Sequence, residues 1–105
     1  MITVFVKYKL PAGTDRAAAH RQSEAAAPKF QALDGLKTKY FLYQPEEGCG
    51  GGFYIWNSRA EAEAFHTGAW LDSMEARMGA RPEMTFFETA VVVDNAAGEV
   101  LVDAA

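Results

Sequence analysis

The sequence predicts an α+β protein in which two helices cover one face of a four-stranded antiparallel sheet. Segments rich in β-branched and aromatic residues alternate with helical segments in the order β-α-β-β-α-β. The chain has 105 residues, the usual size of one domain. Half of them are hydrophobic, so apolar burial can offset the entropy cost of folding. Together these observations predict the split βαβ, or ferredoxin-like, sandwich.

The first three elements follow from residue type and from a helix-start signal. Residues 2–9 and 36–44 are rich in β-branched and aromatic side chains, which is typical of strands. Between them, Thr14 or Asp15 can cap a helix that runs to about Leu33. The inward stripe of this helix is mostly small: Ala19, Ser23, Ala26, Ala27, Phe30 and Leu33. Such side chains permit close packing on the sheet, or leave room for a ligand between helix and sheet.

A glycine-rich segment precedes the third strand. Residues 44–52 predict a flexible turn, and residues 53–57 predict the strand. The glycines do not fit a phosphate loop, because no Lys-Ser or Lys-Thr pair follows them and the next element is a strand. Cys49 has no neighbouring His or Asp, so we do not expect a catalytic thiol.

The second helix has the clearest local signal. Ser58 and Glu61 fit the capping box, in which two side chains satisfy free amides of the first turn. The helix therefore begins at Ser58, and we expect Gly68 to interrupt it and Gly79 to end it. Residues 84–93 predict the fourth strand.

The predicted strands are apolar on both faces, which a two-layer domain does not need. In the first strand Val4 and Val6 oppose Phe5, and in the third Ile55 opposes Tyr54. The helix-free face is too apolar to be left in water, and a second copy of the same sheet is the simplest cover. We therefore predict a homodimer.

Composition limits the partners and the location. Ten basic against fourteen acidic residues give a net charge of -4, which disfavours nucleic acid or an anionic membrane surface as partner. No signal peptide is visible, no apolar run approaches the roughly 20 residues of a membrane span, and one cysteine cannot form an internal disulfide. We expect a cytoplasmic protein with one domain over residues 1–94, followed by a turn and a short strand or tail over residues 95–105.

Four polar side chains are candidates for chemistry. A neutral His66 on the inner edge of the second helix could act as a base, although a boundary histidine bonded to backbone or water is the alternative. Tyr40 is the second candidate for handling a proton. Lys7 or Lys39 could point inward and stabilise an anionic substrate oxygen, or could form a solvated strand edge. Two widely spaced histidines and one cysteine make no recognisable zinc site, so we expect no metal.

Several segments resemble the YdhR-like mono-oxygenase family of the dimeric α/β-barrel superfamily. They are Ala-Pro-Lys-Phe at 27–30, Gly-Leu-Lys-Thr-Lys-Tyr-Phe-Leu at 35–42, and residues 51–65 and 85–94. The likeness covers nearly the whole chain, from the first strand to about Asp94. It implies a homodimer whose sheets pack face to face as a dimeric α/β barrel, with a pocket between helices and sheet in each subunit.

The resemblance also implies chemistry. Relatives in the superfamily include cofactor-free oxygenases that turn polyphenols into quinones, where the ionised substrate itself gives an electron to oxygen. Such an enzyme needs a ring-shaped pocket, a base and an oxyanion donor. Haem-degrading relatives carry Asn, Trp and His where this chain has Lys7, Phe65 and Glu75. The resemblance therefore argues against haem, and we expect no cofactor.

Two classes of function are open. The first is a cofactor-independent mono-oxygenase-like enzyme for a small aromatic or polyketide-like compound, with His66 or Tyr40 as proton handler. Lys39 or Lys7 would be the oxyanion partner. The walls would be Tyr54, Trp56, Phe65 and Trp70, which an ordinary core could equally use. The second class is a non-catalytic dimeric module that binds a small molecule or serves a stress response. An isomerase or cyclase on the same scaffold would need a base and no oxygen.

Overall fold

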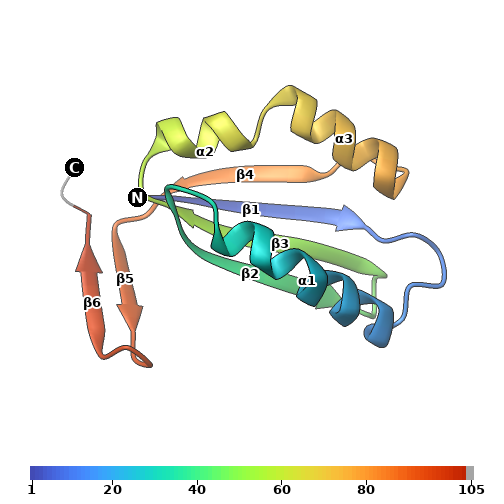
Figure 1. The fold of residues 1–105 in the computed structure, drawn as a ribbon, viewed down its shortest axis with the longest axis horizontal. Helices are drawn as coiled ribbons and strands as arrows, with labels where there is room; N and C mark the ends of the chain where they lie inside the picture. Colours follow the sequence, from blue (N-terminus) through green and yellow to red (C-terminus); the bar gives the residue numbers. More distant parts are fainter. Residues whose placement is uncertain (104–105) are drawn as a thin grey trace.

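The computed structural model describes residues 1–103 and has the predicted layers (Figure 1). Its elements are β1 (Ile2–Lys9), α1 (Arg16–Gln31), β2 (Leu36–Gln44), β3 (Cys49–Trp56), α2 (Arg59–Phe65), α3 (Gly68–Met78), β4 (Glu83–Glu88), β5 (Val91–Asp94) and β6 (Glu99–Val102). The first four strands form one antiparallel sheet in the order β2-β3-β1-β4, and β5 and β6 form a separate hairpin. This confirms the α+β class and the ferredoxin-like order. Residues 104 and 105 of the expected tail lie outside the described residues.

The core lies between the sheet and the helices. Val4 and Val6 of β1 are fully buried, and Tyr54 and Trp56 of β3 lie beside them. The register places Val4 opposite Tyr54 on one side and opposite Phe86 of β4 on the other. Burying an aliphatic or aromatic side chain of this size contributes about 1.5–3 kcal/mol to the stability of the fold. These buried side chains therefore determine which face of the sheet the helices cover.

The helices begin at the predicted capping residues. Asp15 caps α1, and Ser58 caps α2 by accepting a hydrogen bond from the Glu61 amide at 3.2 Å. The Glu61 carboxylate accepts a hydrogen bond from the Ser58 hydroxyl at 2.9 Å, so the second contact of the capping box is between the two side chains. The interruption comes before Gly68, because Thr67 caps α3 and Gly68 is its first residue. Within residues 1–103, no helix has the length and apolar character to cross a bilayer.

The prediction of a flexible turn up to residue 52 is wrong for residues 49–52. β3 begins at Cys49, and residues 50–52 are paired with β1 on one side and β2 on the other. Side chains fill the space beside Gly50 and Gly52, and the backbone of Val6 lies against Gly51. A side chain at Gly52 would collide with Lys39 Nζ and with the ring of Tyr54. The bare backbone at Gly52 therefore makes room for these two groups.

The strand predicted over residues 84–93 is two strands in different sheets. β4 ends at Glu88, because its neighbour β1 begins at the residue paired with it, Ile2. Beyond that point the sheet offers no partner, and the chain instead forms the β5–β6 hairpin at the end of the sheet (Figure 1). An ion pair of 2.9 Å between the Met1 amine and the Asp103 carboxylate ties the hairpin to the start of β1.

The face of the sheet away from the helices is apolar, as the strand pattern predicts. Tyr40, Leu42 and Phe87 on this face are 57%, 41% and 51% exposed. Phe5 and Phe53 are half-buried beside them, with ring centroids 6.0 Å apart. A single chain thus leaves large rings in contact with water on one side of the sheet.

Candidate functional site

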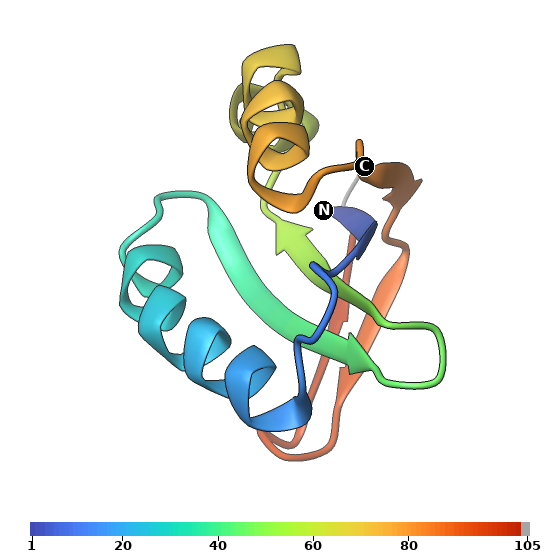
Figure 2. The ribbon, with the colours of Figure 1, turned by 90° about the vertical axis from the view of Figure 1, so that its right-hand side faces the viewer.

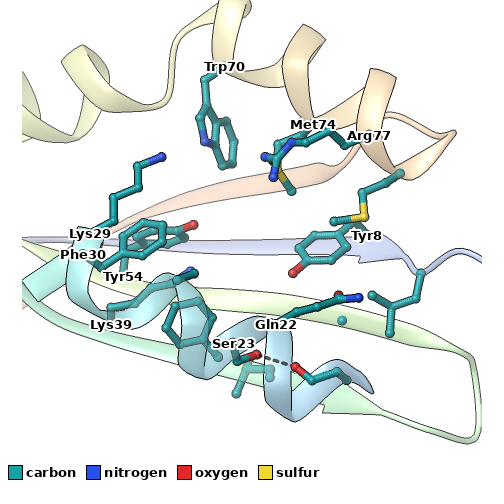
Figure 3. A pocket seen from close by; sticks show the side chains of 17 residues that line it. Tyr8, Gln22, Ser23, Lys29, Phe30, Lys39, Tyr54, Trp70, Met74 and Arg77 are labelled. Carbon is teal, nitrogen blue, oxygen red and sulfur yellow. Dashed lines mark hydrogen bonds between the residues drawn. The ribbon is translucent and has the colours of Figure 1, made fainter. Parts of the chain in front are cut away.

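A cleft of about 380 Å³ opens between α1, α3 and the sheet (Figure 3). Figure 2 shows α1 and α3 standing apart over the sheet. The residues that line the cleft come from both helices and from the sheet. The small residues Ala19, Ser23 and Ala26 form its α1 wall, as the helical stripe predicts. The other walls and the floor include Tyr8, Phe30, Lys39, Phe41, Tyr54, Trp70, Met74 and Arg77.

Lys39 is the most unusual side chain in the cleft. Its Nζ lies 3.7 Å from the ring centroid of Tyr54, 4.4 Å from that of Phe41 and 4.7 Å from that of Phe30. Among residues 1–103 it forms no ion pair. Burial lowers the pKa of Lys39 from 10.5 to about 7, while the three ring faces favour the charged form. Both the amine and the ammonium are therefore accessible near neutral pH.

Two phenols share the cleft with Lys39. Burial raises the pKa of Tyr8 and of Tyr54, and the positive charge of Arg77 opposes part of each rise. Both phenols are therefore protonated at neutral pH and can donate hydrogen bonds to a ligand. The strand alternation of β1 could have identified Tyr8, because it lies on the same face as the buried Val6.

His66 lies in the core behind the cleft and does not line it. It is the C-cap residue of α2 and only 5% exposed, so the alternative of a boundary side chain bonded to backbone or water is corrected: the imidazole lies in the core. The Trp56 indole N–H donates to His66 Nε2 at 3.2 Å, and Nδ1 has no hydrogen-bond partner within residues 1–103. Burial, and then the charge of Lys39, lower the pKa of His66 to about 4.

The imidazole supports the cleft walls from behind. Its ring meets those of Tyr54 and Trp70 edge-on, with centroids 4.6 and 4.7 Å apart. Trp56 and Phe65 pack around the same imidazole, and neither lines the cleft. Of the predicted walls, Tyr54 and Trp70 therefore face the ligand space, and the other two belong to the layer behind it.

Tyr40 and Lys7 lie on the opposite face of the sheet from the cleft. Successive side chains of a strand point to opposite faces, so Tyr40 faces away from the side that Lys39 occupies. Tyr40 stacks on Phe53, with centroids 6.3 Å apart, and Lys7 pairs with Glu47 at 3.0 Å. The structure thus does not bring either residue to the ligand space. Within residues 1–103, no group of three His, Cys, Asp or Glu side chains could hold a metal ion.

No protein-family model and no curated protein matches the sequence, but solved structures match the fold. A protein of unknown function from Nitrosomonas europaea is 20% identical with a TM-score of 0.66, over 84% of this chain and 87% of that one. A “putative antibiotic biosynthesis monooxygenase” from Deinococcus radiodurans is 14% identical with a TM-score of 0.65, over 90% and 97%. A variant of SnoaB, a cofactor-independent oxygenase from Streptomyces nogalater, is 13% identical with a TM-score of 0.58, over 84% and 91%.

The chain shares their fold. The monooxygenase names among these ferredoxin-like neighbours agree with the resemblance in the sequence. At such identities the likeness shows the ferredoxin-like fold and does not identify the reaction, which depends on the side chains of the cleft.

Proposed function

We propose that this chain is a cofactor-independent mono-oxygenase-like enzyme that oxidises a small aromatic or polyketide-like phenol in the cleft. The main support is Lys39, because its amine forms no ion pair within residues 1–103 and is enclosed by three ring faces in a cleft large enough for a small ligand. The shared fold with a cofactor-independent oxygenase supports the class of reaction.

The cleft suits a flat, partly polar ligand. Phe30, Tyr54 and Trp70 offer ring surfaces on different elements, against which an aromatic substrate can pack. The hydroxyl groups of Tyr8 and Tyr54 can donate hydrogen bonds to its oxygen atoms. These contacts would hold the phenolic oxygen beside Lys39.

The neutral amine of Lys39 would begin the reaction by removing the phenolic proton. The ammonium that forms then lies next to the phenolate that it created and stabilises its charge. The phenolate transfers one electron to O₂, and the resulting radical and superoxide combine at a ring carbon that bears hydrogen. The ammonium returns its proton to the peroxide, the O–O bond breaks, and the carbon loses its proton. One oxygen atom becomes the quinone carbonyl and the other leaves as water, so no external reductant is needed.

Oxygen uptake tests this proposal. With a panel of hydroquinones, naphthols and anthrones, we expect the purified protein to consume one O₂ per quinone formed and to incorporate one ¹⁸O atom from labelled oxygen. Turnover without oxygen consumption would instead support an isomerase or cyclase. Ligand binding without any turnover would support the non-catalytic binding module.

The exposed apolar face supports a homodimer built sheet to sheet. Large rings such as Phe87 and Tyr40 are more than half exposed in a single chain, and a second sheet would remove them from water. We expect light scattering to give twice the chain mass at micromolar concentration, and Phe87→Glu to shift the protein toward the monomer. A single-chain mass for the unmodified protein would contradict the dimer.

A further inference from the structure

The cleft carries a charge opposite to that of the chain. Lys29, Lys39 and Arg77 line it, and no Asp or Glu of the described residues does, although acidic residues outnumber basic ones by fourteen to ten. Among residues 1–103 none of these three cations forms an ion pair. Of the seven basic side chains outside the cleft, three are paired with carboxylates within residues 1–103, namely Lys7, Arg59 and Arg81. Unpaired positive charge around a cleft attracts an anionic ligand.

The charges stand on different walls. Lys39 rises from the sheet, whereas Arg77 extends from α3 and its guanidinium lies beside Met74 on the opposite wall (Figure 3). The guanidinium of Arg77 donates a hydrogen bond of 2.7 Å to the sulfur of Met74, which is a weak acceptor. Within residues 1–103 its other N–H donors form no hydrogen bond with the protein, so they are free to bind a ligand. The planar guanidinium fork matches a carboxylate, while the ammonium of Lys39 is a point charge suited to a single oxygen atom.

We propose that the natural ligand is a hydroxyaryl carboxylate, a flat ring system with its hydroxyl group at Lys39 and a carboxylate at the far end on Arg77. Lys29 at the edge of the cleft adds attraction for the same negative charge. The inference deepens the proposed function and rests on the same cleft, but it concerns binding alone. Arg77 would then be a specificity-determining residue that takes no part in the proton transfer.

Calorimetric titration at pH 6 with 6-hydroxy-2-naphthoic acid and with its methyl ester tests the inference. The two compounds share ring and hydroxyl and differ in the negative charge. We expect the acid to bind about tenfold more tightly than the ester, the loss typical of removing one charge-assisted contact. Arg77→Met should weaken binding of the acid about tenfold and leave the ester unchanged, whereas Arg77→Lys should retain part of the preference. Arg21→Met, on the exposed side of α1, is the matched control and should change neither affinity.

Equal affinities for acid and ester, no binding of either compound, or an equal effect of Arg77→Met on both would overturn the inference. The proposed function fails separately. Tight binding of the acid without oxygen uptake would support the hydroxyaryl carboxylate as ligand and contradict the oxygenase reaction. Oxygen uptake with neutral phenols, and no preference for the acid, would support the oxygenase reaction and contradict the hydroxyaryl carboxylate as ligand.

Discussion

Lys39→Met is expected to lower oxygen uptake by at least about 100-fold, the usual contribution of a positioned acid or base. Methionine has a similar length and is apolar, so it can occupy the space between Phe30, Phe41 and Tyr54 without disturbing the rings. The variant should therefore fold. What it loses is the group that accepts the phenolic proton and then faces the phenolate.

The pH dependence of uptake separates these two roles of Lys39. Its pKa is lowered to about 7, so uptake should rise as the pH increases through that region and the amine becomes neutral. Lys39→Arg keeps a cation beside the substrate but stays protonated at every working pH. We expect this variant to bind the aromatic acid and to remain nearly inactive, with no transition near pH 7.

Lys37→Met is the matched control for these variants. Lys37 belongs to the same strand but lies exposed at an irregularity in the β2–β3 register and does not line the cleft. Its replacement should leave both the rate and the pH transition unchanged. If Lys39→Met kept more than about a tenth of the uptake, the base would have to be sought elsewhere.

The sequence predicted the fold well wherever one local signal decided an element. The strands of residues 2–9 and 36–44 and the cap at Ser58 lie where residue type and side-chain chemistry place them. The predicted element boundaries were wrong where pairing between strands distant in the sequence determines them. The glycines at 50–52 were predicted to form a turn, but they belong to a central strand that pairs with β1 and β2, and neighbouring side-chain or backbone atoms occupy the space beside them. The sequence predicts that the strand continues beyond Glu88, but the neighbouring strand β1 offers no further residue to pair with there.

The candidate site was harder to predict because it depends on which face of each strand is covered. Lys39 and Tyr40 are adjacent in the sequence and both fit a proton-handling role, yet only one of them can face the helices. Arg77 was missed because charged helix residues usually face solvent, and the small residues of the first helix indicate room for a ligand without showing which side chains of α3 line it. His66 was expected on the inner edge of the second helix, but it is the residue that ends α2, and its side chain is buried in the core.

Buried His66 makes the stability of the protein sensitive to acid. The pKa of His66 in the folded protein is about 4, below the value of 6.5 that applies to the unfolded chain. As the pH falls below 6.5 the unfolded chain binds a proton first, so the free energy of unfolding decreases between pH 6.5 and about 4. Above pH 6.5 both states are neutral and this contribution is fully present. The difference of the two pKa values corresponds to a loss of about 3 kcal/mol.

Urea denaturation between pH 8 and pH 4.5 measures this loss, and His66→Gln should remove most of it. Glutamine can still accept the hydrogen bond of the Trp56 indole through its side-chain carbonyl, but it cannot bind a proton in this range. The variant should be less stable than the unmodified protein at pH 8, because an amide fits the surrounding rings less well, and its stability should vary much less down to pH 4.5. His20→Gln is the control, since His20 is exposed on α1 and its replacement should leave the acid sensitivity intact. An equally steep loss of stability in His66→Gln would show that other groups cause it and that the buried imidazole does not resist protonation.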